Sequence, residues 1–347
     1  MVLLMKVRDY SIDLLRILCC FLVIGIHVTP YYDQYLLQSV TESQKIIALL
    51  IQSVVRVGLP VFFVISGMFI LNSEIRSVTD FYRKRVSSLL VPFIIYALLH
   101  SIIYMTVTGT PITYKTALDI IDQLKSSTGI SPHFWFVYSM LGIYLVSPAF
   151  NVFIKGISER DSIIALGIII ASSGYMQYFG NAVPGFTLPT LGVWMSYFII
   201  GGLLSKIESY KKSFMLALLI ASFVFTSFCI YLQFNVLKSS NLVPYDGGLN
   251  MMLFTITLCL FFKKINIKPA TLTCKIIEIV SPRTYGIYLI HIVILTTIAH
   301  YIDFSWYVGN ILTYSLLMST TTFFVSLIIS LIVDKLLCSP ILKVINN

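Results

Sequence analysis

Charged residues are scarce in this sequence. Only 11% of the 347 residues are Asp, Glu, Lys or Arg, and 57% are hydrophobic, whereas an ordinary soluble domain is about a quarter charged. This composition excludes a disordered chain and a collagen, and it means that water is not the main solvent of the chain. We therefore expect an integral membrane protein.

Cysteine provides neither a disulfide framework nor a metal site. The six cysteines fall in predicted helices or on the predicted inner side of the membrane, and none has CxxC spacing. The five histidines have no clustered carboxylate or cysteine beside them. We therefore expect no zinc site and no metal cofactor.

Apolar runs recur from residue 12 to residue 333. Each is about the 20 residues that a helix needs to cross a bilayer, which favours helices over barrel strands and an all-α, polytopic helical bundle. The whole chain, 1–347, is expected to be one membrane domain. We predict ten spans, near residues 12–29, 47–71, 88–107, 134–154, 162–179, 189–205, 213–234, 248–263, 284–302 and 309–333.

Positive charge is distributed unevenly over the predicted connections. Of 24 Lys and Arg residues, 18 fall on one side and four on the other, and an excess of Lys and Arg marks the cytoplasmic side. Both termini are therefore predicted inside, and the net charge of +9 requires no nucleic acid. The four outer cations are Lys45, Lys115, Lys125 and Lys238.

The first two spans contain ionisable residues where charge is costly. Arg16 and Arg56 would each cost a few kcal/mol if they faced lipid. Asp13 precedes Arg16 by three residues, a spacing at which the two side chains pair on a helix. His27 follows Arg16 by three helical turns plus about 20°. The two side chains are therefore predicted to lie on one face of the helix, about 16 Å apart along its axis. The plain alternative is that Arg16 snorkels to the interface and His27 hydrogen-bonds a carbonyl.

Other polar residues have similarly plain alternatives. Arg83, Lys84 and Arg85 are typical of a topology and lipid-headgroup anchor. A tryptophan at the start of a span, such as Trp135, is most often an interfacial anchor. His133 beside it means little alone.

Taken in order, these residues resemble the motifs of the acyltransferase type 3 family, membrane proteins that O-acylate bacterial glycans with acyl-CoA. The resemblance covers nearly the whole chain, with one departure: Ser88 stands where the family often has a second Arg, three residues after Arg85. The matching segments are Asp13, Arg16 and His27; Arg56 to Pro60, Ser66 and Gly67; Phe81 to Arg85 and Pro92; His133 to Phe136; and Tyr285 to His291.

The resemblance implies a transferase that moves acetyl from cytoplasmic acetyl-CoA to a hydroxyl of a lipid-linked or surface glycan, in the bacterial inner membrane. It implies that His27 is the general base, with Asp13 and Arg16 as further catalytic residues and Arg56 stabilising the oxyanion or positioning the sugar. We expect no esterase-like domain of the kind that some relatives carry, so the membrane domain itself would bind the acceptor.

The same reading divides the remaining residues between donor and acceptor. Arg83, Lys84 and Arg85 would contact the CoA phosphates, and Arg16 would hold the entering arm of CoA. The acceptor contacts would be Arg56, Ser66, His133, Trp135 and His291. A polytopic transporter or glycan exporter is the alternative, because buried arginines also suit a transport pathway; a structural scaffold is less favoured, since it does not need them.

Overall fold

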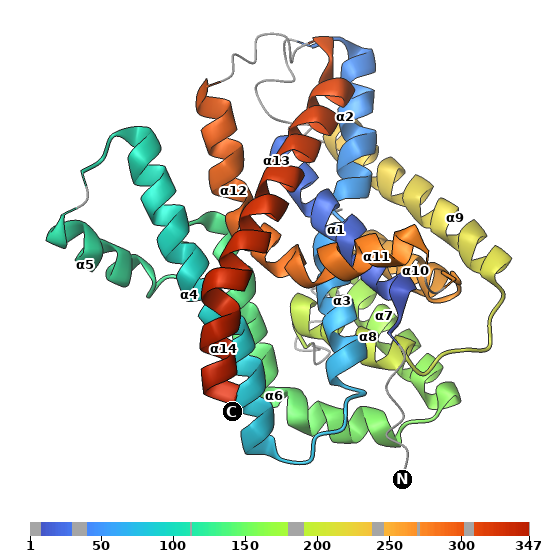
Figure 1. Cartoon of the computed structure of the whole chain (residues 1–347). Coiled ribbons are helices and arrows are strands. Elements are labelled where there is room, and N and C mark those ends of the chain that lie inside the picture. Colours follow the sequence, from blue (N-terminus) through green and yellow to red (C-terminus); the bar gives the residue numbers. More distant parts are fainter. Residues whose placement is uncertain are drawn as a thin grey trace.

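The computed structural model describes residues 8–29, 40–111, 113–179, 191–237, 246–268, 271–301 and 309–346. Within these ranges the chain forms helices and turns and no strand (Figure 1). In this part of the chain eight helical segments, one of them running from Glu42 to Ile70, are long and apolar enough to cross a membrane. The predicted polytopic helical bundle is therefore confirmed.

The helices follow the predicted spans closely. Two of the spans, 189–205 and 248–263, correspond to shorter helices of 12 and 15 residues, α8 and α10. The helices that match spans are α1 (Tyr10–Val28), α2 (Glu42–Val55), α3 (Gly58–Ile70), α4 (Val78–Thr108), α6 (Trp135–Gly156), α7 (Glu159–Phe179), α8 (Val193–Leu204), α9 (Lys212–Tyr231), α10 (Leu249–Lys263), α12 (Thr284–Tyr301) and α13 (Ile311–Val333).

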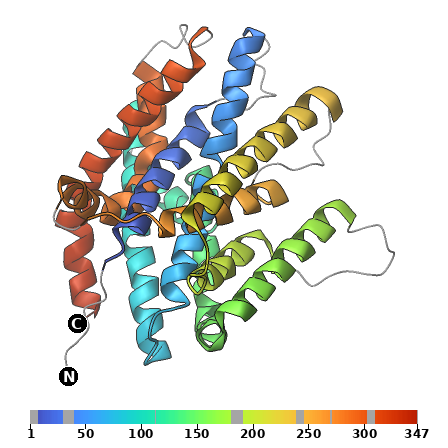
Figure 2. The same cartoon turned by 90° about the vertical axis from the view of Figure 1, so that its right-hand side faces the viewer.

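Helix α1 lies among α2, α3, α10, α12 and α13, while α7 and α9 lie on one flank of the bundle (Figure 2). Its first turn is fixed by Asp9, whose carboxylate accepts hydrogen bonds from the backbone N–H groups of Ser11 (3.1 Å) and Ile12 (3.2 Å). Such a cap satisfies N–H groups that otherwise have no partner in the helix. The cap therefore fixes the residue at which α1 begins.

The second span is broken in the middle, which the sequence-based prediction of one helix over 47–71 missed. Helix α2 ends at Val55 and α3 begins at Gly58. Pro60 has no N–H to donate to the carbonyl of Arg56, four residues earlier, so the α-helical ladder is interrupted there. The break places Arg56 at a helix end.

Helix α3 packs very closely against α8. A Cβ added at Gly67 would lie 1.8 Å from the carbonyl oxygen of Phe198, and one added at Gly201 would lie 2.0 Å from that of Val64. Only glycine fits at these two positions. Small residues allow such close backbone approach between helices in a membrane.

Several helix boundaries differ from the prediction. Helix α4 begins at Val78 rather than near residue 88, and the last span continues past residue 333 through the π-helical turn η7 (Asp334–Cys338) into α14 (Ser339–Asn346). Two further helices, α5 (Tyr114–Gln123) and α11 (Leu272–Val280), were not predicted because both are too short to span. Lys238 lies outside the described residues.

The bundle has two distinct ends. The inner end contains the start of α4 and helix α14, which are joined by the hydroxyl of Ser87 and the amide of Asn346 at 3.4 Å. The outer end contains the starts of α2 and α13, where the N–H of Ile311 donates to Gln44 Oε1 at 3.1 Å. We name the two ends after the sides on which the charge distribution predicts these segments to lie.

Candidate functional site

A cavity of about 1140 Å³ opens at the inner end of the bundle. Its walls come from α1, α3, α4, α6 and α12, together with the turn after α8 and the end of α10. Five of the lining residues are cations, against two acidic residues, Asp9 and Asp13. A cavity with this charge favours an anionic ligand. The five cations are Arg8, Arg16, Arg85, Lys206 and Lys263.

Asp13 and Arg16 form the polar wall that α1 contributes to this cavity. The Asp13 carboxylate is buried and forms ion pairs with Arg16 (3.1 Å) and Arg8 (2.5 Å), so the pairing expected from the three-residue spacing is present. Ser281, just before α12, donates to Asp13 Oδ1 at 2.7 Å and accepts from Arg16 at 3.4 Å. The Arg16 guanidinium also lies 5.3 Å from the ring centre of Phe69. It is therefore held by three groups and still lines the cavity.

The basic cluster at the start of α4 contributes only one of its three residues to the cavity. Arg85 is half-buried and lines it, together with Ser88. Arg83 and Lys84 are exposed and do not line it, and Arg83 forms an ion pair with Asp80 at 3.2 Å. Successive helical residues point about 100° apart, so three adjacent cations do not share one face.

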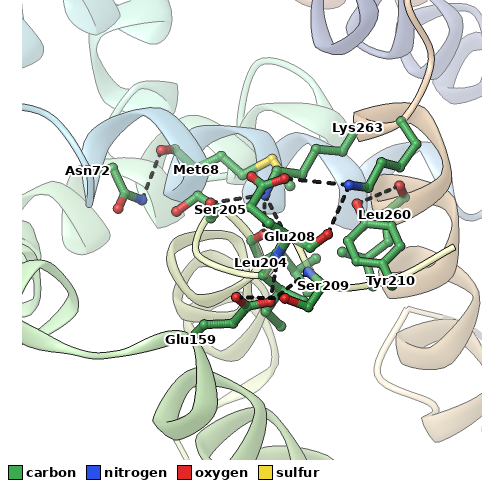
Figure 3. A network of polar contacts seen from close by, with 12 residues as sticks. Met68, Asn72, Glu159, Leu204, Ser205, Glu208, Ser209, Tyr210, Leu260 and Lys263 are labelled. Atoms are coloured by element: carbon green, nitrogen blue, oxygen red, sulfur yellow. Dashed lines mark hydrogen bonds and ion pairs between the residues drawn. The ribbon is translucent and has the colours of Figure 1, made fainter. Parts of the chain in front are cut away.

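Lys263, which no sequence motif singles out, organises the opposite wall. Its ammonium donates to the carbonyls of Leu204, Ser205 and Ile207 at 2.8–3.0 Å and pairs with Glu208 at 2.7 Å (Figure 3). These carbonyl groups belong to the last residue of α8 and to the turn that follows it, and a cation is favourable at the C-terminal end of a helix. Lys263 thereby fixes the turn that contains Lys206.

A second acidic residue, Glu159, holds the turn that follows α8. Glu159, at the start of α7, accepts hydrogen bonds from the backbone N–H groups of Glu208 (2.8 Å) and Ser209 (2.7 Å). Tyr210 then donates to the carbonyl of Leu260 at 2.9 Å. Burial raises the pKa of the Tyr210 phenol above its ordinary value, so the hydroxyl stays a donor at neutral pH.

The cavity extends into the bundle as far as Tyr288 of α12. The hydroxyl of this tyrosine donates to the carbonyl of His133, and its own carbonyl accepts from Nδ1 of His291 at 2.5 Å. Its ring centre lies 5.3 Å from His133 and 5.6 Å from His291. Tyr288 therefore links the inner cavity to a group of histidines.

Four of the five histidines form this group, which we call the histidine cluster: His27, His100, His133 and His291. Ring centres lie 5.3 Å apart for His27 and His291, 4.8 Å for His133 and His291, and 6.0 Å for His100 and His133. The side chain of His27 is exposed, whereas residues 23–26 and 28 are buried. His27 is thus the accessible member of the cluster.

His291 is fully buried and holds one tautomer. Because a carbonyl only accepts, the contact with Tyr288 requires a proton on Nδ1 of His291, and Nε2 then carries a lone pair. Among the described residues Nε2 has no hydrogen-bond partner. A buried acceptor without a donor is unusual, and this one belongs to a ring in contact with His27.

Arg56 lies near the outer end of α1, 7% exposed. Its Nε donates to Gln52 at 3.2 Å, and Gln52 donates to the carbonyl of Thr29, two residues beyond His27, at 2.7 Å. Asp246, which precedes α10, also interacts with Arg56 and was not expected at this site. Burial raises the pKa of its carboxyl, and the positive charge of Arg56 lowers it. Arg56 thus carries its charge close to His27.

The predicted acceptor residues are placed differently from the expectation. Ser66 lines the inner cavity and donates to the carbonyl of Phe62 at 2.8 Å. His133 is 3% exposed rather than interfacial. Trp135 is partly buried, and its ring packs against Trp194 (4.8 Å between centres) and Phe63 (6.4 Å). These contacts join residues far apart in the sequence, which hydropathy does not show.

The described residues contain no group of three or more His, Cys, Asp or Glu side chains arranged to hold a metal ion.

Membrane-length helices around a cation-lined cavity define a polytopic membrane protein. The chain belongs to the acyltransferase type 3 family: the family's model, described as an acyltransferase domain, matches residues 9–333. No curated protein and no solved structure matches the chain. The chain is therefore a multi-pass membrane acyltransferase.

Proposed function

We propose that this acyltransferase moves an acetyl group from cytoplasmic acetyl-CoA to a hydroxyl of a lipid-linked or surface glycan, in the inner membrane of a bacterium. One observation carries the proposal. A cation-lined cavity at the inner end reaches Tyr288, and Tyr288 contacts the cluster that contains His27.

The donor site in this proposal is the inner cavity. CoA is strongly anionic and carries a long arm that ends in the thioester. Arg85 and Lys206 line the cavity and form no ion pair within the described residues, so their charges suit the phosphates. Arg8 lines it too, but is ion-paired with Asp13. Arg16, held by Asp13, lies deeper and would bind the arm. Lys263 acts indirectly, because its ammonium is occupied by the carbonyls of the turn before Lys206.

The acceptor hydroxyl would react at His27. Its oxygen attacks the thioester carbonyl carbon while its proton passes to His27. Arg56 stabilises the oxyanion of the tetrahedral intermediate. The C–S bond then breaks, and the proton on His27 returns to the CoA thiolate. A route through an acetyl-histidine would use the same groups in two steps.

Two variants test this assignment. Purified protein is incubated with radiolabelled acetyl-CoA and fractions of lipid-linked glycans, and label in the glycan is measured. We expect no label with His27→Ala. Arg16→Lys keeps the charge but loses the planar guanidinium, whose Nη1 donates to both Asp13 and Ser281, so we expect a large loss of turnover in folded protein. Label at the wild-type level in His27→Ala would overturn the mechanism.

A further inference from the structure

A second cavity of about 490 Å³ lies beside the end of α4, between α4, α5, α12 and residues 129–132. It shares no lining residue with the inner cavity. Helix α5 stands off the flank of the bundle at this place (Figure 1). The mechanism proposed above makes no use of this outer cavity.

The outer cavity has a lining rich in polar groups but without Lys or Arg. It therefore does not suit a phosphate or a nucleotide, which require cations. Its apolar residues are interspersed with hydroxyl, amide, carboxylate and imidazole groups. The polar lining residues are His100, Ser101, Tyr104, Thr110, Asp119, Gln123, Ser131 and Thr296.

Two hydroxyl groups of the lining already use their protons. Ser101 donates to the carbonyl of Ala97 at 3.0 Å, and Thr296 donates to that of Val293 at 3.0 Å. A hydroxyl oxygen that donates once still offers lone pairs to a ligand. Ser101 and Thr296 therefore face the cavity as acceptors.

Ser131 also uses its hydroxyl proton, which it donates to His133. Nε2 of His133 must donate to the carbonyl of Leu289 (3.2 Å), so Nδ1 of the neutral ring accepts from the Ser131 hydroxyl at 2.8 Å. Ser131 is thus a third hydroxyl that presents lone pairs. The Asp119 carboxylate adds two acceptor oxygens.

His100 has a buried ring nitrogen without a partner beside the same cavity. This imidazole lines the outer cavity and is only 5% exposed, yet its Nδ1 has no hydrogen-bond partner in the described part of the chain. Buried polar atoms normally have a partner. The unpartnered nitrogen belongs to a ring that forms part of the cavity wall.

An acceptor-rich cavity without cations fits a neutral ligand that carries several hydroxyl groups and one apolar face. We infer that the outer cavity binds a neutral sugar ring of the acceptor glycan, next to the ring that is acylated. This inference rests on the proposed function, because it takes the ligand to be part of the acceptor. The site is accessory, since His133 and His291 lie between His100 and His27.

Helix α5 offers a matched pair of variants. Asp119 lines the cavity, whereas Asp122 does not and is ion-paired with Lys125 at 2.6 Å. The hydrogen bond from Lys125 holds the pKa of Asp122 below its ordinary value. Asp119→Asn and Asp122→Asn remove the same charge from the same helix. Thr296→Val, which removes one acceptor at similar shape, provides a third variant.

The probe is a panel of free neutral hexoses and hexose disaccharides, with binding to the detergent-solubilised protein measured by saturation-transfer NMR. We expect Asp119→Asn to weaken binding about tenfold, as for the loss of one charge-assisted hydrogen bond. Thr296→Val should weaken it several-fold, and Asp122→Asn should leave it unchanged. Equal weakening by the two Asp variants, or no binding by any sugar of the panel, would overturn the inference.

The same measurement on His27→Ala separates this site from the acyl-transfer chemistry. We expect sugar binding to survive that substitution, because His27 does not line the outer cavity. Asp119-dependent binding without any acetyl transfer in the wild type would sink the proposed function and keep the sugar site. Acetyl transfer without Asp119-dependent binding would sink the sugar site and keep the proposed function.

Discussion

Arg85 and Arg83 lie two residues apart on α4, yet we expect opposite consequences from replacing them with Gln. Two helical residues are about 200° apart around the axis. Arg85 lines the inner cavity, whereas Arg83 is exposed and paired with Asp80. If the cavity binds acetyl-CoA, only Arg85 is placed to contact a phosphate.

The expected size of the effect follows from the partial burial of Arg85. A hydrogen bond to a charged group contributes about 1.5–3 kcal/mol, and we take the lower value because Arg85 is half-buried and screened by solvent. A loss of about 1.5 kcal/mol corresponds to a KM for acetyl-CoA about tenfold higher. Arg83→Gln should change KM less than about twofold, as surface charges usually do.

Initial rates over a range of acetyl-CoA concentrations, at saturating acceptor, measure this difference. We expect kcat to stay within about twofold in both variants, because the phosphate contact binds substrate and transition state alike. Added salt should raise KM more in the wild type than in Arg85→Gln. Equal shifts in KM for the two variants, or a wild-type KM in Arg85→Gln, would refute this placement of the donor.

Three further outcomes are expected. His27→Ala should abolish transfer with little change in melting temperature. His300→Ala, at the exposed end of α12, should leave transfer intact. Activity assays and thermal unfolding in detergent measure both variants. Gly67→Ala should destabilise the protein by about 3 kcal/mol, because the added Cβ would meet Phe198. Gly142→Ala should be neutral, because nothing lies within 4 Å of a Cβ added there. Similar melting temperatures for the two variants would contradict the close packing of α3 against α8. A cysteine in place of Lys125 should react with an impermeant maleimide from outside the cell, and labelling only after lysis would reverse the topology.

The sequence predicted the local features of the site well. Asp13 and Arg16 are three residues apart on one helix, so their ion pair depends on helical geometry alone. The break at Arg56 was also present in the sequence, because Pro60 removes the hydrogen bond that would bridge it. It was missed because hydropathy averages over the whole span.

The residues that the prediction missed contact the site from distant parts of the chain. Ser281 meets Asp13 across 268 positions, and Tyr288 meets His133 across 155. Lys263 reaches the end of α8 across 59. Periodicity within one helix contains no information about such pairs.

The sequence by itself determined that this chain is a bundle of membrane helices, because bilayer thickness and the cost of an unpaired backbone act on each segment separately. It also determined the partner of Arg16, because that partner lies within one helical turn. Only the tertiary structure decided that Arg85 rather than Arg83 lines the cavity and that His291 lies against His27. It also decided that Trp135 packs on Trp194. These outcomes depend on how each helix is rotated and tilted against its neighbours, and packing between helices sets that rotation.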